Sequence, residues 1–357
     1  MALIKTPYNL IYNDDGSLCV TLRDDDVPFE GVKSFAVEEG TENLLATSGY
    51  DPGKVYSGTT YPFLQWNITD KIQTTWIDEG DGYCTYSWQF EGKKDSGDGY
   101  PRFYLWFGDW SWNINTAIPS FDFKKSILQV RMPNPTNKSV FFGVYHYPFN
   151  SSGRSYAKNM QLERKAFSTS FVNGARPYGQ FKFNQNWDYN NVVFSTWFKI
   201  NKVNNPYPRI FDQTPDDTNS VDDFGFYYEQ ITSKFKLKAN TIELLSPYIS
   251  NSDVTNKWWF VVIGFDNDIG FIKLYDENSL FWDTTFTNNI NNESVKQYMF
   301  KIGDSGTKQR LLNGLISNLF IGDYKDKDGN VIWTDEFIQE IYNAKKPFAV
   351  PAKIPII

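Results

Sequence analysis

Two tryptophans, Trp110 and Trp112, stand two positions apart just beyond a predicted strand, in a stretch that we expect to be a loop. Alternation along an extended chain would place both indoles on the same side. A sugar ring has an apolar C–H face that stacks on an aromatic ring, while its hydroxyls pair with planar amides and carboxylates. Asp109 and Asn113 would supply such partners. These four residues form a candidate glycan site; alternatively, the indoles cover the end of a sheet or contact a neighbouring subunit.

A further candidate is Trp282, which precedes Asp283 in a predicted hairpin arm. We include it as a surface position for sugar contact. Three other tryptophans, Trp197, Trp258 and Trp259, lie inside predicted strands and are expected in the core. Because neighbouring strand residues point to opposite faces, Trp258 and Trp259 must face opposite sides of their sheet.

Carboxylates are concentrated in one stretch of the second half, which contains Asp212, Asp216, Asp217, Asp222 and Asp223. Ca²⁺ prefers several hard oxygen ligands at ~2.3–2.6 Å. This stretch is therefore a candidate Ca²⁺ site, and Ca²⁺ is the one cofactor that the residues suggest. The alternative is a solvated acidic loop, which is the commoner meaning of such a run.

Residues suited to hydrolytic catalysis are scarce. The single histidine, His146, stands between Tyr145 and Tyr147 in a predicted strand. A Ser-His-Asp or His-metal centre would thus depend on one residue with no diagnostic neighbourhood. We interpret His146 as a packed side chain and assign no catalytic residue. A glycan-degrading enzyme remains an alternative, because a glycosidase needs only two carboxylates.

The charge distribution argues against nucleic acid and membrane partners. The chain has 357 residues and a formal net charge of −7, and its 35 Lys and Arg residues occur singly or in pairs. No basic stripe is present to neutralise phosphates or anionic lipid. The first residues lack the apolar core of a secretory signal peptide, and no run approaches the ~20 apolar residues that span a bilayer. We expect a soluble product of the cytoplasm without membrane insertion.

The apolar residues favour an all-β protein. Aromatic residues make up 18% of the chain, and they favour strands and large contact surfaces. Strand-like runs alternate with Gly, Pro, Asn and Asp clusters without a sustained 3.6-residue period, which is typical of sandwiches. In the first half these runs cover 61–68, 74–77, 83–90, 102–107, 126–132, 139–147 and 156–162. In the second half they include 192–200, 209–212, 224–230, 234–239, 258–266, 271–275, 280–286 and 314–320.

One helix is expected, near the C-terminus. Thr334 can cap it, Asp335 and Glu336 occupy its first turn, and an apolar stripe follows up to residue 344. At the other end of the chain, residues 8–22 form a predicted hairpin around an Asp-Gly turn. Residues 1–36 are too few for a core of their own, so we expect an attachment arm or an added sheet edge.

Two motifs at the ends of the first half carry a family resemblance. Residues 37–45 resemble the "EEGTtNLl" opening of carbohydrate-binding-like jelly-roll modules that recur in bacteriophage structural and tail proteins, with Glu42 where Thr is more usual. The stretch from Met160 to Phe171 resembles the "QLE…aTSf" ending of the same modules. The resemblance implies a jelly-roll sandwich over residues 37–174.

The second half is similar to the laminin G-like, concanavalin A-like lectin sandwich. The similarity lies in the strands at 194–199, 257–262 and 271–275 and in the closing strand at 313–321, followed by the helix. The hairpin after Tyr275 departs from the family pattern, with Asp276-Glu277-Asn278 where Asp-Gly is common. This resemblance implies a lectin-type sandwich over residues 175–350, with 351–357 as a tail.

Taken together, the sequence predicts two β-sandwich (jelly-roll) domains in tandem with one short C-terminal helix. The connector at 173–177 is short, which predicts a nearly fixed orientation of the domains. The resemblance implies a non-catalytic bacteriophage virion protein, a tail or head fibre or a capsid decoration, assembled in the host cytoplasm. Expected partners are cell-surface glycan, other virion proteins and further copies of the chain in a homo-oligomer. The alternative is a purely structural virion protein without sugar binding.

Overall fold

The computed structural model divides the chain into two compact units. One unit, here the split unit, combines Met1–Glu39 with Tyr178–Ile357, and the other, here the inserted unit, is Gly40–Pro177. The structure describes residues 4–5, 10–12, 18–23, 26–37, 41–46, 51–60, 62–108, 110–112, 118–165, 175–176, 181–183, 187–214, 224–255, 257–295, 298, 300–303 and 310–345. The first sandwich is thus an insertion between two segments of the second, a chain path that the sequence reasoning did not include.

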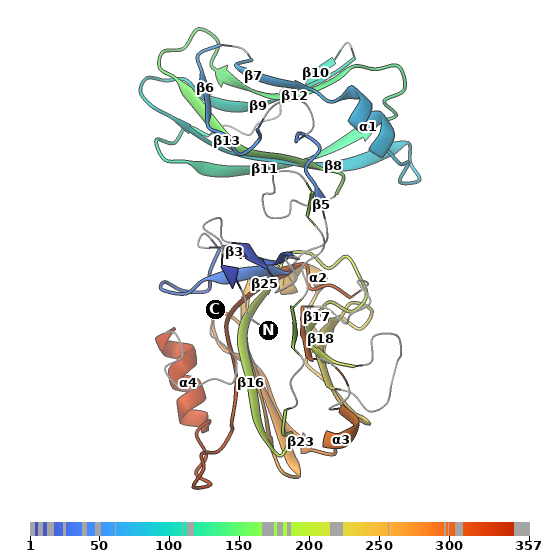
Figure 1. Ribbon diagram of the computed structural model, residues 1–357, viewed down its shortest axis with the longest axis vertical. Helices are drawn as coiled ribbons and strands as arrows, with labels where there is room; N and C mark the ends of the chain where they lie inside the picture. Colours follow the sequence, from blue (N-terminus) through green and yellow to red (C-terminus); the bar gives the residue numbers. More distant parts are fainter. Residues whose placement is uncertain are drawn as a thin grey trace. The chain divides into compact units, whose positions relative to one another are not determined.

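The split unit is built on a nine-stranded antiparallel sheet (Figure 1). In spatial order its strands are β1 (Ile4–Lys5), β2 (Leu10–Tyr12), β3 (Leu18–Arg23), β4 (Ser34–Val37), β25 (Gly314–Gly322), β16 (Asn191–Ile200), β21 (Trp258–Asp266), β22 (Ile269–Tyr275) and β23 (Leu280–Thr287). The predicted N-terminal hairpin is confirmed as the pair β2–β3. Of the two alternatives for residues 1–36, the structure shows the added sheet edge, because β4 pairs with β25.

A six-stranded sheet faces the nine-stranded one. Its order is β15 (Phe181–Phe183), β24 (Phe300–Ile302), β17 (Arg209–Gln213), β18 (Phe224–Glu229), β19 (Lys234–Ala239) and β20 (Ile242–Leu245). Strand β19 alternates strictly, burying Phe235 and Leu237 and turning its lysines outward. Aromatic rings from both sheets meet in the core, where Phe194 of β16 stacks on Phe300 of β24 at 5.2 Å. The split unit is therefore a β-sandwich.

The second face of the nine-stranded sheet is covered by the C-terminal helix α4 (Asp335–Ala344). Figure 1 shows α4 beside β16, on the side away from β17 and β18. The Tyr342 ring lies 4.4 Å from that of Tyr275 and 6.0 Å from that of Trp197. Because both faces of this sheet are buried, its central strands are apolar at successive positions rather than alternating. The predicted C-terminal helix is confirmed, with Thr334 as its N-cap.

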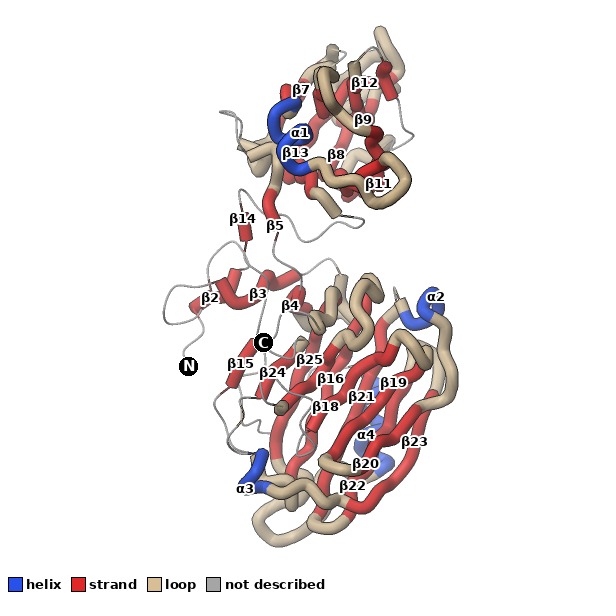
Figure 2. The backbone as a smooth tube through the Cα atoms, turned by 90° about the vertical axis from the view of Figure 1, so that its right-hand side faces the viewer, coloured by secondary structure: helices blue, strands red, loops and turns tan. Residues whose placement is uncertain are grey.

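Two one-turn helices complete the split unit. They are α2 (Asn251–Val254) and α3 (Asn292–Val295), and Figures 1 and 2 place them at opposite ends of the sandwich. The Ser250 hydroxyl caps α2 by accepting a hydrogen bond from the Asp253 amide. Within the described part of the chain, no helix is both long and apolar enough to cross a membrane.

The inserted unit is a second sandwich, made of two four-stranded antiparallel sheets. One has the order β10 (Trp110–Trp112), β9 (Tyr100–Phe107), β12 (Val140–Tyr147) and β7 (Leu64–Asn67). The other has the order β11 (Lys124–Pro133), β8 (Tyr83–Lys94), β13 (Ser155–Glu163) and β6 (Tyr56–Gly58). Their inner faces share one core centred on Trp88, whose ring lies 5.3 Å from Phe103 and 5.5 Å from Phe142. The all-β, two-sandwich fold class is confirmed.

A short helix, α1 (Thr69–Thr75), replaces the strand expected at residues 74–77. Its apolar contacts repeat every four residues: Ile68 and Ile72 are buried, and Trp76 packs against the core. Such spacing fits a helix and not a strand. The strands β5 (Thr41–Glu42) and β14 (Ala175–Arg176) pair with each other, so the two ends of the inserted unit lie side by side.

Candidate functional site

The candidate residues Trp110 and Trp112 belong to a strand and not to the expected loop. Strand β10 pairs with β9, where Trp110 is opposite Phe107 and Trp112 is opposite Leu105. Both partners are core residues. The side chains of the two tryptophans, like Asp109 and Asn113 as a whole, lie outside the described residues. Sugar contact by this group stays a prediction.

Trp282 is not the surface residue that the sequence suggested. It is 7% exposed and belongs to the core between the two sheets of the split unit. Alternation along β23 buries Trp282 and Phe286 on the same face, and this face points into the sandwich. Trp258 and Trp259 face opposite sides as expected, and both are buried: Trp259 lies in the core between the two sheets, and Trp258 lies in the core that α4 covers.

The Asp212 side chain is fully buried and lies next to two positively charged side chains. Its carboxylate lies 3.2 Å from Nε of Arg209 and 3.9 Å from Nζ of Lys301, and it accepts a hydrogen bond from the Thr214 amide at 3.0 Å. Calcium would have to displace both cations. The other candidate ligands, Asp216, Asp217, Asp222 and Asp223, lie outside the described residues, and no group of three potential metal ligands occurs within the described ones.

His146 is a packed side chain, 1% exposed. Its Nδ1 lies 2.8 Å from the Ser155 hydroxyl and its Nε2 lies 2.9 Å from the Ser151 hydroxyl. The ring occupies the space beside Gly99, where a Cβ would come within 1.9 Å of it. The Ser151 hydroxyl donates to the Pro148 carbonyl, so His146 Nε2 is the donor in its contact with Ser151. This arrangement is that of a structural histidine.

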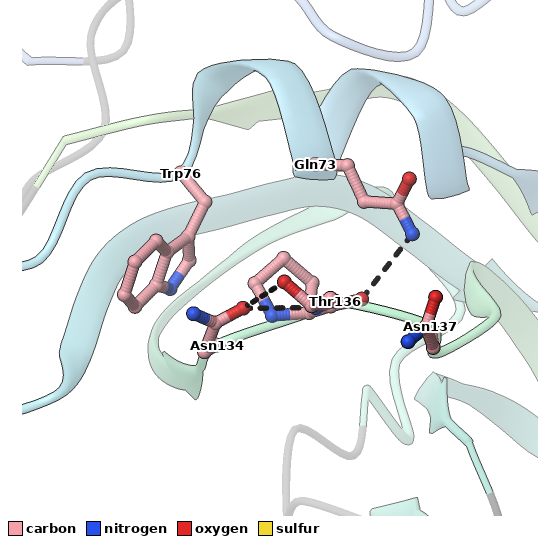
Figure 3. Close-up of a pocket in the computed structure, with 6 residues that line it drawn as sticks. Gln73, Trp76, Asn134, Thr136 and Asn137 are labelled. Carbon is pink, nitrogen blue, oxygen red and sulfur yellow. Dashed lines mark hydrogen bonds between the residues drawn. The ribbon is translucent and has the colours of Figure 1, made fainter.

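A pocket of about 220 Å³ opens between the end of α1 and the turn that joins β11 to β12 (Figure 3). The helix side contributes Gln73 and Trp76, and the turn contributes the segment 134–137. The volume is below the ~300–1,000 Å³ of drug-sized ligand sites. It therefore suits a single ring with its substituents.

The aromatic wall of the pocket is held in place. Trp76 follows α1 directly, is half-buried, and packs on the core of the inserted unit. Its indole N–H donates to the Met132 carbonyl at 3.1 Å. Gln73 closes the other side by donating its amide to the Pro135 carbonyl at 3.2 Å. The indole orientation is therefore fixed before any ligand arrives, which lowers the entropic cost of binding.

The facing turn presents amide groups. The Asn134 side-chain oxygen accepts hydrogen bonds from the Thr136 amide at 2.9 Å and the Thr136 hydroxyl at 2.6 Å. Asn137 has a positive φ of 59°, a conformation that asparagine tolerates better than most residues. Among the described residues, the Asn134 NH₂, the Gln73 side-chain oxygen and the Asn137 side chain have no hydrogen-bond partner. The wall thus offers donors and acceptors and no charge, which suits a neutral polyhydroxylated ring.

Sequence reasoning missed this pocket, although two signals for it were present. Ile68, Ile72 and Trp76 have helical spacing, which would have placed Trp76 at the end of a helix. Asn134-Pro135-Thr136-Asn137 is a turn sequence next to a predicted strand. Their meeting could not be foreseen, because it depends on packing across the sandwich.

Comparisons with known proteins found distant likenesses among solved structures. No protein-family model and no curated protein matches the chain. Among solved structures, the carbohydrate binding module CBM66 from Bacillus subtilis has 10% identity and a TM-score of 0.22, covering 37% of this chain and 74% of that one. The LG1-3 region of the laminin α2 chain has 8% identity and a TM-score of 0.29, covering 78% and 66%. The extracellular region of zebrafish Gpr126/Adgrg6 has 10% identity and a TM-score of 0.28, covering 81% and 37%.

The chain spans less than two thirds of the laminin region and of the receptor region that it matches. All three TM-scores are below 0.5, so the likenesses say nothing about the ligand or partners of this chain.

Proposed function

We propose that this chain is a non-catalytic adhesion protein that binds a neutral sugar ring in the pocket between α1 and the β11–β12 turn. The observation that carries the proposal is the fixed Trp76 indole facing the unpartnered Asn134 NH₂ among the described residues. An indole takes up the C–H face of a sugar, and amides pair with its hydroxyls. The carbohydrate-binding-like motifs in the sequence support the same ligand class.

A pocket of this size makes a weak site on its own. One aromatic contact and a few hydrogen bonds leave little free energy after the cost of association. Adhesion then depends on many copies acting together, since linked sites raise avidity without new contacts. The expected homo-oligomer fits this requirement.

A bacteriophage particle is the proposed carrier. The motifs at 37–45 and 160–171 support it, because they resemble modules of phage structural and tail proteins. The chain would then be assembled in the host cytoplasm with other virion proteins. Mass spectrometry and antibody labelling of purified particles test this placement: the chain should co-purify with particles and be accessible on their surface, and its absence from particles would contradict it.

A glycan array tests the binding function. Asn134→Asp is the sharpest variant, because the carboxylate can still accept from Thr136 while the NH₂ donor is lost. Loss of one useful hydrogen bond costs about 1 kcal/mol, or roughly fivefold in affinity.

Asn67→Asp is the matched control for Asn134→Asp. The Asn67 side-chain oxygen accepts from the Thr69 amide and hydroxyl in the same local motif, and Asn67 does not line the pocket. We expect neutral glycans to bind the natural chain and the control alike and to bind Asn134→Asp at least fivefold more weakly. Equal binding by all three proteins would place the sugar elsewhere, and no binding by any of them would favour a purely structural role.

A further inference from the structure

A second surface of the inserted unit combines cations with aromatic rings. It lies on the outer face of the sheet that contains β11, β8 and β13. Lys93 of β8 is paired in register with Tyr156 of β13. The Lys93 Nζ lies 5.3 Å from the Tyr156 ring centroid and 5.0 Å from that of Phe123, which directly precedes β11. We call this set of three residues the Lys93 cradle.

The ammonium of Lys93 has no carboxylate partner among the described residues, and it lies over the two rings. Cation–π attraction at a partly exposed site is worth about 0.5–1 kcal/mol, which positions the ammonium without neutralising it. Glu91, two residues before Lys93 on β8, is already paired with Lys158 at 3.2 Å and accepts a hydrogen bond from the Asn159 amide at 2.8 Å. The cradle therefore holds a cation that the two rings orient and that no carboxylate of the described residues neutralises.

A second cation flanks Tyr156. Arg154 lies just before β13, two residues before Tyr156, and its guanidinium reaches Ser57, the register partner of Tyr156. The guanidinium of Arg154 donates to the Ser57 hydroxyl at 3.3 Å and has no carboxylate partner within the part of the chain described. Asp95, which lies beside them, is occupied by hydrogen bonds from the Arg154 amide at 2.7 Å and from the Tyr156 hydroxyl at 3.3 Å.

This corner is positive in a chain whose net charge is −7. Its cations come from separate parts of the sequence, so no run of basic residues in the sequence indicates this surface. Lys125 and Lys158 are both register partners of Glu91, Lys93 is the register partner of Tyr156, and Arg154 lies beside Asp95. The Lys158 Nζ also lies 4.5 Å from the Phe123 ring centroid, so Lys158 contacts a ring of the Lys93 cradle. Aromatic faces between cations at this spacing suit rings that carry negative charges.

We infer that the Lys93 cradle binds an acidic glycan, with a sugar ring on Tyr156 and its carboxylate between Lys93 and Arg154. The inference rests on the proposed adhesion function and adds a charged ligand class to the neutral one of the pocket. The two surfaces are built from different residues, so each can fail without the other.

The test compares two forms of one oligosaccharide by titration calorimetry at low salt: a galacturonic acid hexamer and its fully methyl-esterified, uncharged form. The natural chain should bind the acid form at least fivefold more tightly, and added salt should reduce the difference. Equal affinity for the two forms would overturn the inference. Equally tight binding of inorganic polyphosphate would overturn it too, because that would show a response to charge alone.

Lys93→Met removes the charge and keeps an unbranched stem between the rings. It should weaken binding of the acid form about fivefold, the upper range for one exposed ion pair. Lys93→Arg should retain binding, which separates loss of charge from misfolding. Lys327→Met, an exposed lysine of the split unit, is the control with the same change in net charge. Unchanged binding by Lys93→Met, or an equal loss in Lys327→Met, would contradict the inference. Asn134→Asp should bind the acid form like the natural chain, so failure of the pocket and failure of the cradle give different results.

Discussion

Val37 pairs with Gly314 across strands β4 and β25, so the first and last thirds of the chain form one sheet. Val37 and its neighbour Phe35 are fully buried in the core of the split unit. The N-terminal segment is therefore part of the sandwich that the C-terminal half completes. Folding of this unit requires contacts on both sides of the inserted sequence.

Phe35→Ala should destabilise the split unit by about 3–5 kcal/mol, the usual cost of deleting a buried phenylalanine. Urea unfolding followed by tryptophan fluorescence measures the change. Ile231→Ala is the control, because Ile231 is 77% exposed and its removal should cost less than about 0.5 kcal/mol. If the two variants unfold at the same urea concentration, β4 is not an integral strand of the sandwich.

Removing the inserted unit should leave the split unit folded. Thr41 and Arg176 are Cα partners in the β5–β14 pair, so the ends of the insertion are about 5 Å apart. A short Gly-Ser linker can then replace residues 43–174 at little entropic cost. The shortened chain should unfold cooperatively in calorimetry with native-like strand content in circular dichroism. A molten or aggregated product would show that the split unit depends on its insertion.

Asp212→Asn should destabilise the split unit by about 3–5 kcal/mol, because Arg209 and Lys301 would lose a buried counter-charge. The loss should be the same in calcium and in EDTA, as measured by thermal unfolding. A destabilisation seen only in calcium-containing buffer would instead support the Ca²⁺ site predicted for the acidic stretch that begins at Asp212.

Low pH should weaken the hydrogen bonds that Asp95 and Asp98 make with residues 152–154 of the inserted unit. The backbone amides of Ser96 and Arg154 hold the pKa of Asp95 below its usual range, and the Ser152 side chain does the same for the pKa of Asp98. A lowered folded-state pKa contributes stability above the unfolded value of about 3.9, and this stability is lost as the pH falls through the folded pKa. Amide exchange at Ser152 and Arg154 should thus accelerate below about pH 4. In the Asp95→Asn, Asp98→Asn double variant the exchange should be fast already at neutral pH; a pH dependence like that of the natural chain would refute the assignment.

Strand periodicity and turn residues were sufficient to predict the two sandwiches and the terminal helix, because these depend on local sequence. The place of β4 between β3 and β25 was open in sequence, since strand pairing depends on a partner at the far end of the chain. Helix α1 was mistaken for a strand because β-branched residues at 74, 75 and 77 outweighed the four-residue spacing of Ile68, Ile72 and Trp76.

The candidate site was harder to predict than the fold. Trp282 has a charged neighbour, which suggested exposure, but the alternation of β23 decides its burial. Asp212 belongs to an acidic run in sequence, yet in space it faces two cations. The pocket joins the end of a helix to a turn, and the Lys93 cradle joins residues of neighbouring strands. Composition indicated residue types that are suited to sugar contact, and only the three-dimensional arrangement shows which of them lie close together.

The central claim is that a neutral sugar stacks on Trp76. The most direct measurement is a titration of the indole N–H signals in a ¹H–¹⁵N NMR spectrum with the best neutral ligand from the glycan array, with the Trp76 signal assigned from a Trp76→Phe variant. The account predicts that the Trp76 signal shifts with saturation while the core indoles of Trp88 and Trp259 stay unchanged. A saturable shift of Trp110 or Trp112 with Trp76 unmoved would contradict it and return the site to the residues that the sequence first suggested.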